Sequence, residues 1–192
     1  MRYFFILLVG LFFLASCDYQ STEADGQTNT NTELESVLQK KAVAGDANAQ
    51  NNLGLMYVAG EGVPKNDGEA VKWYRKAAEQ GHARAQYNLG VSYATGAGVP
   101  EDDGEAVKWF RKAAEQGLTN AQGNLGLMYA AGDGVPQDFV DAYAWLNIAA
   151  AQGKKKAIEA RDFCRKRLDS ASLAKAQERS REYFKKYVVP FQ

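Results

Sequence analysis

The feature of this sequence that most constrains its fold is a glycine-rich motif that recurs, without insertion or deletion, every 36 residues. The motif reads GEGVPKND at 60–67, GAGVPEDD at 96–103 and GDGVPQDF at 132–139. The residues on either side of each copy also align, so the repeating unit is longer than the motif itself. Because a fixed period of about 20–50 residues is typical of stacked repeats, the sequence predicts a solenoid.

Each unit contains two apolar patterns with the spacing of an α-helix. In the first unit, the earlier pattern consists of Ala49, Leu53, Met56 and Tyr57. The later pattern follows the glycine-rich motif and consists of Ala70, Trp73, Tyr74, Ala77 and Ala78. Both patterns fit the 3.6-residue period of an amphipathic helix, so each unit is predicted to be a pair of helices and the chain to be all-α.

A glycine interrupts the middle of each predicted first helix, at Gly54, Gly90 and Gly126. A glycine inside a helix costs about 1 kcal/mol relative to alanine. We therefore expect a close approach of the paired helix at these positions. The small residues expected to meet the glycines are Ala77, Ala113 and Ala149.

The glycine-rich motifs are predicted to be connections between helices and not phosphate-binding loops. A dinucleotide-binding loop follows a strand and opens a helix, whereas a helix precedes each motif here. We expect Gly60 to end the first helix in a left-handed conformation. Asn66 and Glu69 have the spacing of a capping box, which favours helix caps over a metal site for the carboxylates of these loops.

Half-repeats are predicted at both ends of the solenoid, which spans residues 33–153. At the front, 34–44 has the spacing of a second helix. At the back, residues 154–192 are predicted to be basic capping helices, with Asp169 as the cap of the last helix. The full repeats are predicted at 47–81, 83–117 and 119–153.

These motifs resemble the Sel1-like repeat family, a tetratricopeptide-like group of helical repeats. The shared pattern is A-Q-x-x-L-G-x-x-Y-x-x-G-x-G-V-P followed by A-x-x-W-[YFL]-x-x-A-A-x-Q-G, and it extends over 47–153. The resemblance implies a right-handed αα-solenoid of about three repeats with a concave face. It also implies an adaptor or scaffold that binds other proteins, and signal-bearing bacterial members often work in the cell envelope.

The cysteine content argues against the enzymatic activity associated with some family members. Cysteine-rich members, which are associated with penicillin binding or β-lactamase activity, carry paired cysteines in each repeat. This chain has only Cys17 and Cys164. A β-lactamase-like enzyme is therefore kept only as an alternative. Cys164 lies among apolar residues of a predicted helix and is either a buried interior residue or, less in keeping with its neighbours, a reactive thiol.

The sequence shows no catalytic or metal-binding constellation. His82 is the only histidine, and a zinc site needs three or four ligands. We expect no enzyme, no cofactor and no small-molecule substrate. Because the formal net charge is zero and export is predicted from the N-terminus, nucleic acid is not an expected partner.

The first residues resemble a bacterial lipoprotein signal. Residues 1–16 contain a basic start and an apolar run too short to span a bilayer comfortably. They end in Leu-Ala-Ser before Cys17, as in a lipobox, which implies lipidation of Cys17 and a protein anchored in the bilayer, facing the periplasm. In enterobacterial lipoproteins an aspartate such as Asp18 favours the inner membrane, although it could equally be a linker residue. The polar residues 17–32 are predicted to be a flexible tether.

Candidate partner-binding residues lie on the first helices, which usually line the concave face of helical-repeat arrays. Some of these positions vary between otherwise matching blocks, so they are free for recognition or merely unconstrained. A second row is apolar and forms either a strip for a peptide or packing between repeats. A scaffold is the predicted role, with a periplasmic immunity protein that sequesters a toxin as the alternative. The candidates are Asn48, Asn51, Leu55, Arg84, Tyr87, Val91, Asn120, Asn124 and Leu127.

Charge is distributed unevenly along the predicted mature chain. Residues 18–153 contain 10 basic and 18 acidic residues, a net charge of −8. Residues 154–192 contain 12 basic and 5 acidic residues, a net charge of +7. The basic end is either a solvated cap or a surface for anionic lipid headgroups.

Overall fold

The computed structural model describes residues 28–191, in which every regular element is a helix. The elements are α2 (Thr28–Val43), α3 (Ala47–Ala59), α4 (Asp67–Glu79), α5 (Ala83–Thr95), α6 (Asp103–Glu115), α7 (Thr119–Ala131), α8 (Phe139–Ala151), α9 (Lys155–Arg165), α10 (Ser170–Tyr187) and the 3₁₀ helix η2 (Val189–Phe191).

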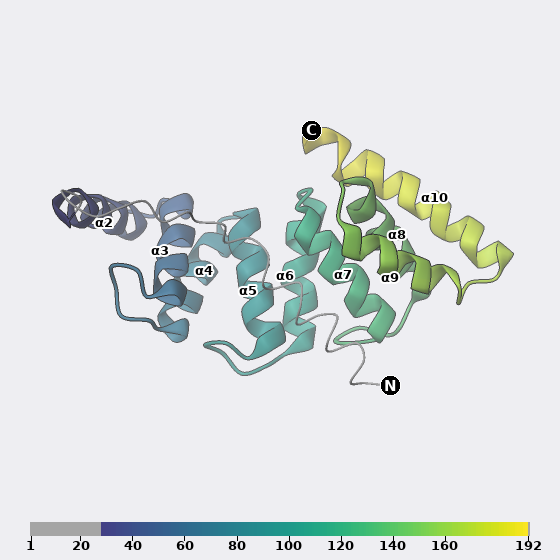
Figure 1. Cartoon of the computed structure of the whole chain (residues 1–192), viewed down its shortest axis with the longest axis horizontal. Coiled ribbons are helices and arrows are strands. Elements are labelled where there is room, and N and C mark those ends of the chain that lie inside the picture. The colour runs from purple at the N-terminus through teal and green to yellow at the C-terminus, as the bar shows by residue number, and fades with distance from the viewer. Residues whose placement is uncertain (1–27, 192) are drawn as a thin grey trace.

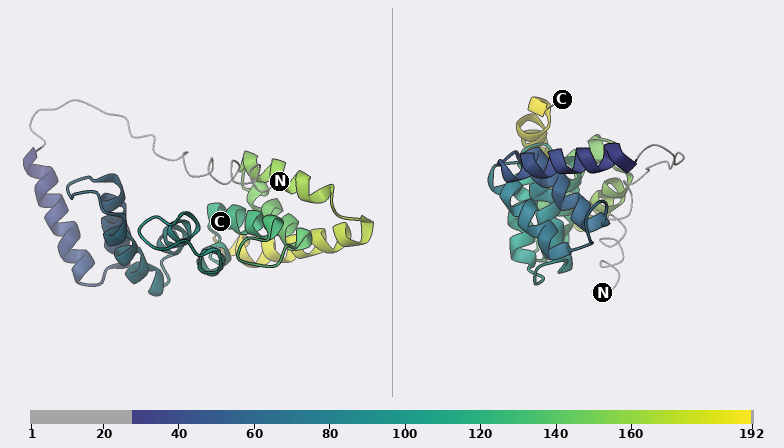
Figure 2. Two further views of the ribbon diagram at one scale, coloured as in Figure 1. Left: turned by 90° about the horizontal axis from the view of Figure 1, so that it is seen from below. Right: turned by 90° about the vertical axis from the view of Figure 1, so that its left-hand side faces the viewer.

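The helices form a row of stacked pairs, which confirms the predicted all-α solenoid. The first helices α3, α5 and α7 pack on the second helices α4, α6 and α8, and each second helix packs on the next first helix. The row runs from α2 at one end to α9 and α10 at the other (Figure 1). Seen along the row, the successive helices overlap one another (Figure 2).

At the N-terminal end, α2 is longer than the sequence predicted. It begins at Thr28, within the segment assigned to the tether, whereas the predicted boundary was residue 33. Threonine and asparagine cost about 0.7 kcal/mol or less in a helix, so a helix nucleated further along can extend back through them. The predicted signal peptide, Cys17 and Asp18 lie outside the described residues. Among the residues that the structure describes, no helix is long and apolar enough to cross a bilayer.

The glycines within the first helices accept large side chains and not the alanines that were predicted. A Cβ atom on Gly54 would lie 2.5 Å from Cε1 of Tyr74, and one on Gly90 would lie 2.8 Å from Cδ1 of Phe110. In the third repeat the same relation holds between Gly126 and Leu146, at 2.7 Å. Close approach was therefore predicted correctly, but its purpose is to make room for a buried side chain of the second helix.

The loops between paired helices begin and end as predicted. Gly60 has a φ of 76° and ends α3, and its backbone N–H donates to the carbonyl oxygen of Met56. Asn66 caps α4, since its side chain accepts a hydrogen bond from the Glu69 backbone N–H at 3.0 Å. The reciprocal half of the predicted capping box does not form. The Asn66 N–H donates to the carbonyl of Tyr57, and the Glu69 carboxylate pairs with Lys72.

The second glycine of the later loops brings adjacent repeats into contact. A Cβ atom on Gly98 would lie 2.2 Å from the carbonyl oxygen of Asp67, at the start of α4 in the preceding repeat. Gly134 has the same relation to Asp103. Since only glycine leaves room for this backbone contact, the loops stack on one another as the repeats do.

Buried glutamines connect successive repeats through a series of hydrogen bonds that we call the glutamine ladder. Each first-helix glutamine donates through Nε2 to a carbonyl oxygen near the end of the preceding second helix, and accepts through Oε1 from a glutamine at the end of its own second helix. The donors to backbone carbonyls are Gln50 to Ala42, Gln86 to Ala78 and Gln122 to Ala114, at 3.1, 3.1 and 3.2 Å. The donors to glutamine oxygens are Gln80, Gln116 and Gln152, at 2.7, 2.8 and 2.7 Å.

At the C-terminal end, α10 packs on α8 rather than forming a fourth pair with α9. Tyr187 stacks on Trp145 and Tyr183 packs on it at a tilt, with ring centroids 5.5 and 4.5 Å from that of Trp145. The face of α8 that receives α10 differs from α4 and α6, because Ala144 and Ile148 replace lysines there. This replacement is the sequence signal for a helix covering α8.

The array ends at α9 because this helix cannot accept another second helix. Asp162 occupies the position of the buried glycine Gly126, and it pairs with Arg161 at 2.8 Å. A side chain such as Leu146 therefore has no space to enter. The aspartate in place of glycine at position 162 explains why α9 ends the array.

Candidate functional site

The nine candidate residues lie on the first helices α3, α5 and α7, but they differ in exposure. The exposed ones are Asn48, Leu55 and Arg84. Those of intermediate burial are Tyr87, Val91 and Asn120, and the buried ones are Asn51, Asn124 and Leu127. The three buried residues are not accessible to a partner in this structure, so the candidate surface is smaller than the sequence indicated.

The buried asparagines join neighbouring first helices. Asn88 of α5 donates through Nδ2 to Oδ1 of Asn51 in α3, at 3.0 Å. In the next repeat, the side chain of Asn124 in α7 interacts with the hydroxyl of Tyr87 in α5, while its Oδ1 is buried without a hydrogen-bond partner. Because these contacts occur between helices, Asn51 and Asn124 are better explained as spacers of the array than as contacts for another protein.

The apolar row Leu55, Val91 and Leu127 becomes steadily more buried along the array. Leu55 is 46% exposed, and Leu127 is 3% exposed within a cluster that includes Cys164. Val91 packs against the cluster that contains Met128. The row therefore packs between repeats at its C-terminal end and is open at its N-terminal end.

The result is an open first-helix surface on α3 and α5. Val58, which is 41% exposed, extends the apolar part of this surface one helical turn beyond Leu55. Sequence reasoning missed Val58. The sequence signal that could have revealed it is the repeat position occupied by Val58, Ala94 and Ala130, because only the first repeat has a side chain larger than alanine there. We define the open face as Asn48, Asn52, Leu55, Val58 and Arg84, all of which are exposed.

The side chains of the second helices are largely committed to packing. Arg75 donates to the Tyr93 hydroxyl at 2.6 Å, and Arg111 does the same to Tyr129. Lys76 lies 4.1 Å from the centroid of the Trp73 ring. These contacts hold α4 and α6 to their neighbours.

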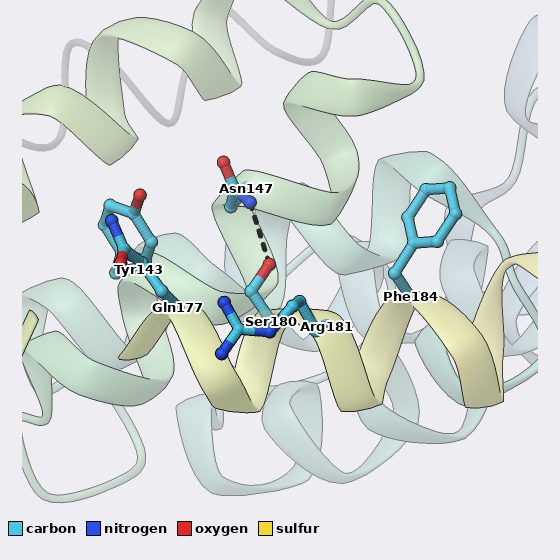
Figure 3. A pocket seen from close by; sticks show the side chains of 6 residues that line it. All are labelled: Tyr143, Asn147, Gln177, Ser180, Arg181 and Phe184. Carbon is cyan, nitrogen blue, oxygen red and sulfur yellow. Dashed lines mark hydrogen bonds between the residues drawn. The ribbon is translucent and has the colours of Figure 1, made fainter. Parts of the chain in front are cut away.

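A pocket of about 380 Å³ lies between α8 and α10. It is open to solvent and is shown in Figure 3. Asn147 donates to the Ser180 hydroxyl at 2.8 Å, so the polar groups at its centre already satisfy each other. The residues that line it are Tyr143, Asn147, Gln177, Ser180, Arg181 and Phe184.

Comparison with known proteins identifies the repeats. A family model for the Sel1 repeat matches three consecutive segments, at 47–82, 83–118 and 119–154. These segments coincide with the helix pairs of the structure and together make up more than half of the chain. The chain is a member of the Sel1 repeat family.

Two solved Sel1-type structures resemble the whole chain or most of it. A protective antigen of uropathogenic Escherichia coli strains, which displays an SLR fold, is 34% identical with a TM-score of 0.77. The match covers 97% of this chain but only 38% of the E. coli chain. A Sel1 repeat protein from Oxalobacter formigenes is 42% identical with a TM-score of 0.61, over 66% of this chain and 96% of that chain. No curated protein matches the sequence.

Membership of the Sel1 family gives the general role of the fold. Sel1 repeats commonly serve as protein–protein interaction scaffolds, and family members are typically non-catalytic. Within the described residues, no group of three or more histidine, cysteine or acidic side chains is arranged to hold a metal ion. The loop carboxylates instead cap the second helices, as with Asp102, which accepts from the Glu105 N–H at 2.9 Å.

Cys164 is an interior residue of the Sel1 array. It is fully buried, and burial raises the pKa of its thiol to about 12. A thiol with this pKa remains protonated at neutral pH and is a poor nucleophile. The structure thus agrees with the interior interpretation of Cys164.

His82 has a structural role that the sequence did not reveal. It precedes α5, and its Nδ1 accepts a hydrogen bond from the Ala85 backbone N–H at 3.1 Å. Its Nε2 lies 3.0 Å from Oδ1 of Asn48. Burial and the charge of Arg84 lower the pKa of His82. The neutral ring is therefore favoured, as an N-cap acceptor requires.

Proposed function

We propose that this chain is a lipid-anchored scaffold of the bacterial cell envelope that binds a segment of another protein on the open face of its first two repeats. The observation that carries this proposal is the difference between the repeats. The open face presents two exposed apolar side chains on α3, Leu55 and Val58, and an exposed cation on α5, Arg84, while the equivalent of Leu55 in the third repeat is buried.

The chemistry of the open face fits a peptide segment. Leu55 and Val58 are one helical turn apart, so they form one apolar strip along α3. Asn48 and Asn52 add amide Nδ2 donors on the same helix, which suit the carbonyl oxygens of a peptide backbone. Their Oδ1 atoms already have partners, His82 Nε2 at 3.0 Å and Asn51 Nδ2 at 3.4 Å. Arg84 of α5, at the repeat position of Asn48, adds an exposed charge to this face. A partner with one or two apolar side chains and a nearby carboxylate would match this arrangement.

Affinity capture with matched variants tests the binding proposal. The variant Leu55→Asp with Arg84→Glu removes the apolar contact and reverses the charge, and burying a leucine contributes about 1.5–3 kcal/mol. We expect at least a tenfold loss of the captured protein. The control Lys72→Glu with Lys108→Glu, on the second helices, should retain it. Equal capture by both variants would place the binding site elsewhere. The identity of the captured protein distinguishes a scaffold from an immunity protein, which would retain a toxin.

The anchoring proposal rests on the sequence of residues 1–17 and has a separate test. Several acyl chains on one cysteine are expected to give stable attachment, because a single chain binds only marginally. Changing Cys17 to Ala should release the protein from the membrane fraction. Retention of that variant in the membrane would mean that the apolar segment itself holds the protein, and the lipidation proposal would be wrong. Asp18→Ser should move the lipoprotein between membranes if Asp18 favours the inner membrane.

A further inference from the structure

We propose that the C-terminal cap of this protein is a docking surface for anionic lipid headgroups. The surface, which we call the basic cap, lies on α9, on α10 and on the turn between them, at the far end of the row of helices from α2 (Figure 1). Its members are exposed basic side chains: Lys155, Arg165, Lys166, Lys175, Arg181 and Lys185.

The side chains of the basic cap are not engaged by the protein. None of the six makes an ion pair or a side-chain hydrogen bond with another described residue. Several basic residues of the repeats differ in this respect. Lys72 pairs with Glu69, Lys108 pairs with Glu105, and Arg75 donates to the Tyr93 hydroxyl. The cap charges are therefore free to meet an external anion.

The acidic residues of the cap are too few to neutralise this surface. Asp162 pairs with Arg161, and Asp169 caps α10 by accepting from the Ser172 N–H at 2.7 Å, while Glu159, Glu178 and Glu182 are exposed among the basic residues. The segment 154–192 has a net charge of +7, from 12 basic and 5 acidic residues. The charges extend over two helices and a turn, an arrangement that matches the diffuse charge of many headgroups better than a single acidic side chain.

The rest of the chain has the opposite net charge, so an anionic surface would attract the cap and not the repeats. Residues 18–153 have a net charge of −8. Acidic loops of adjacent repeats lie close together. Burial and the nearby charges of Asp133, Glu101 and Asp102 raise the pKa of the Asp103 carboxyl. An anionic bilayer would repel these loops and attract the cap, so the cap is the part of the described chain that electrostatics would bring to the surface.

The role of this surface in the cell rests on the proposed anchoring through Cys17. Ten residues separate Cys17 from Thr28, and an extended chain spans at most about 3.6 Å per residue. The anchor would thus keep α2 within about 40 Å of the bilayer. Attraction between the cap and the headgroups acts over about one Debye length, about 8 Å at physiological salt. Docking therefore requires the cap to come within about 8 Å of the headgroups.

Vesicle co-sedimentation tests the basic cap independently of lipidation. The protein used is the unlipidated mature chain from residue 18, which contains every described helix. We expect it to bind phosphatidylcholine vesicles in which about 30% of the lipid is anionic phosphatidylglycerol. Binding to pure phosphatidylcholine vesicles should be at least about tenfold weaker. Binding should fall steeply between about 0.1 and 0.5 M salt, because screening shortens the range of the attraction.

A matched pair of variants locates the binding surface. The cap variant changes Lys155, Arg165, Lys166 and Lys175 to Gln, and should lose at least about 50-fold in vesicle affinity, since each basic residue near a surface contributes about fivefold. The control changes Lys65, Lys72, Lys76 and Lys108 to Gln, which alters the net charge by the same amount, and should lose less than about threefold. Lysine-to-arginine and arginine-to-lysine exchanges at the four cap positions retain the charge and should retain binding, even if the Gln variant is less stable.

Three results would overturn the proposal. The first is equal affinity for anionic and neutral vesicles, and the second is an equal loss in both variants. The third is binding to a polyglutamate peptide without binding to anionic vesicles, which would assign the cap to an acidic protein. None of these results bears on Cys17, so the docking surface and the anchor are tested separately.

Discussion

Oε1 of Gln86 accepts a hydrogen bond from Nε2 of Gln116 at 2.8 Å. Nε2 of Gln86 donates in turn to the carbonyl oxygen of Ala78, so the two bonds connect the end of α6 to the end of α4 in the preceding repeat. Gln86 is 4% exposed, so its amide has no access to bulk water as a replacement partner. Since each repeat of a solenoid contacts only its neighbours, bonds of this kind determine how firmly the units couple.

Replacing Gln86 with alanine should lower the free energy of unfolding by about 1–3 kcal/mol, because it leaves the carbonyl oxygen of Ala78 and the amide of Gln116 without their partner. Urea unfolding followed by circular dichroism measures this change. The exposed residue Gln177 provides the control, and Gln177→Ala should change stability by less than about 0.5 kcal/mol. Similar values for the two variants would show that the glutamine ladder does not stabilise the array.

Replacing Gly90 with alanine should destabilise the protein although alanine is the better helix former. The added Cβ would lie 2.8 Å from the Phe110 ring. Overpacking of this kind costs about 1–3 kcal/mol, and the gain in helix propensity offsets only about 1 kcal/mol. In a double-mutant cycle with Phe110→Ala, the two changes should be less than additive, because the smaller side chain removes the clash. An increase in stability for Gly90→Ala alone would contradict the structure.

His82 should make the stability of the array dependent on pH. Burial of the ring and the charge of Arg84 lower the pKa of His82 below its value in the unfolded chain. The unfolded state therefore binds more protons, and stability rises with pH through this range. The contribution of the neutral ring is present above about pH 6.5 and is lost as pH falls through the folded-state pKa.

Substitution of His82 by Asn tests this linkage, because asparagine is a good N-cap that does not titrate. The difference in unfolding free energy between the wild type and His82→Asn should change between pH 7.5 and pH 5.5, chosen as about one unit on either side of the unfolded-state pKa. The wild type should lose stability relative to the variant on acidification. A difference that is constant with pH would exclude His82 as the titrating group.

Cys164 should be protected from thiol reagents in the folded protein. It is completely buried, and its pKa of about 12 keeps the thiol protonated. At pH 8 an aromatic disulfide reagent should react at a rate limited by unfolding, and rapidly once the chain is unfolded in urea. Fast reaction without denaturant would indicate that α9 opens readily from α8.

The repeats and their boundaries could be predicted from the sequence because a gapless period of 36 residues records the packing of one unit three times. The glycine and cap positions could be predicted for the same reason. The residues that contact them could not be predicted. Sequence spacing showed that Gly54 needs a close neighbour, but Tyr74 and Ala77 are both on the facing helix, and only the structure selects Tyr74.

The exposure of the candidate residues could not be predicted from the sequence, because the repeats look alike while their surroundings differ. Leu55 and Leu127 are the same residue at the same repeat position, yet only Leu127 has the additional helix α9 beside it. The position of α10 was missed although Ala144 and Ile148, in place of lysines, mark the covered face of α8. Exposure at the ends of a solenoid depends on the caps, which do not share the repeat pattern.

Site-specific photo-crosslinking in cells tests the central claim, that the open face binds a protein, most directly. A photo-reactive amino acid is placed at Leu55 or Arg84 on the open face, or at Lys72 or Lys112 on the second helices. The account predicts a crosslinked product of one size from positions 55 and 84 and none from 72 and 112. Products from 72 or 112 alone, or no product from 55 and 84, would contradict it.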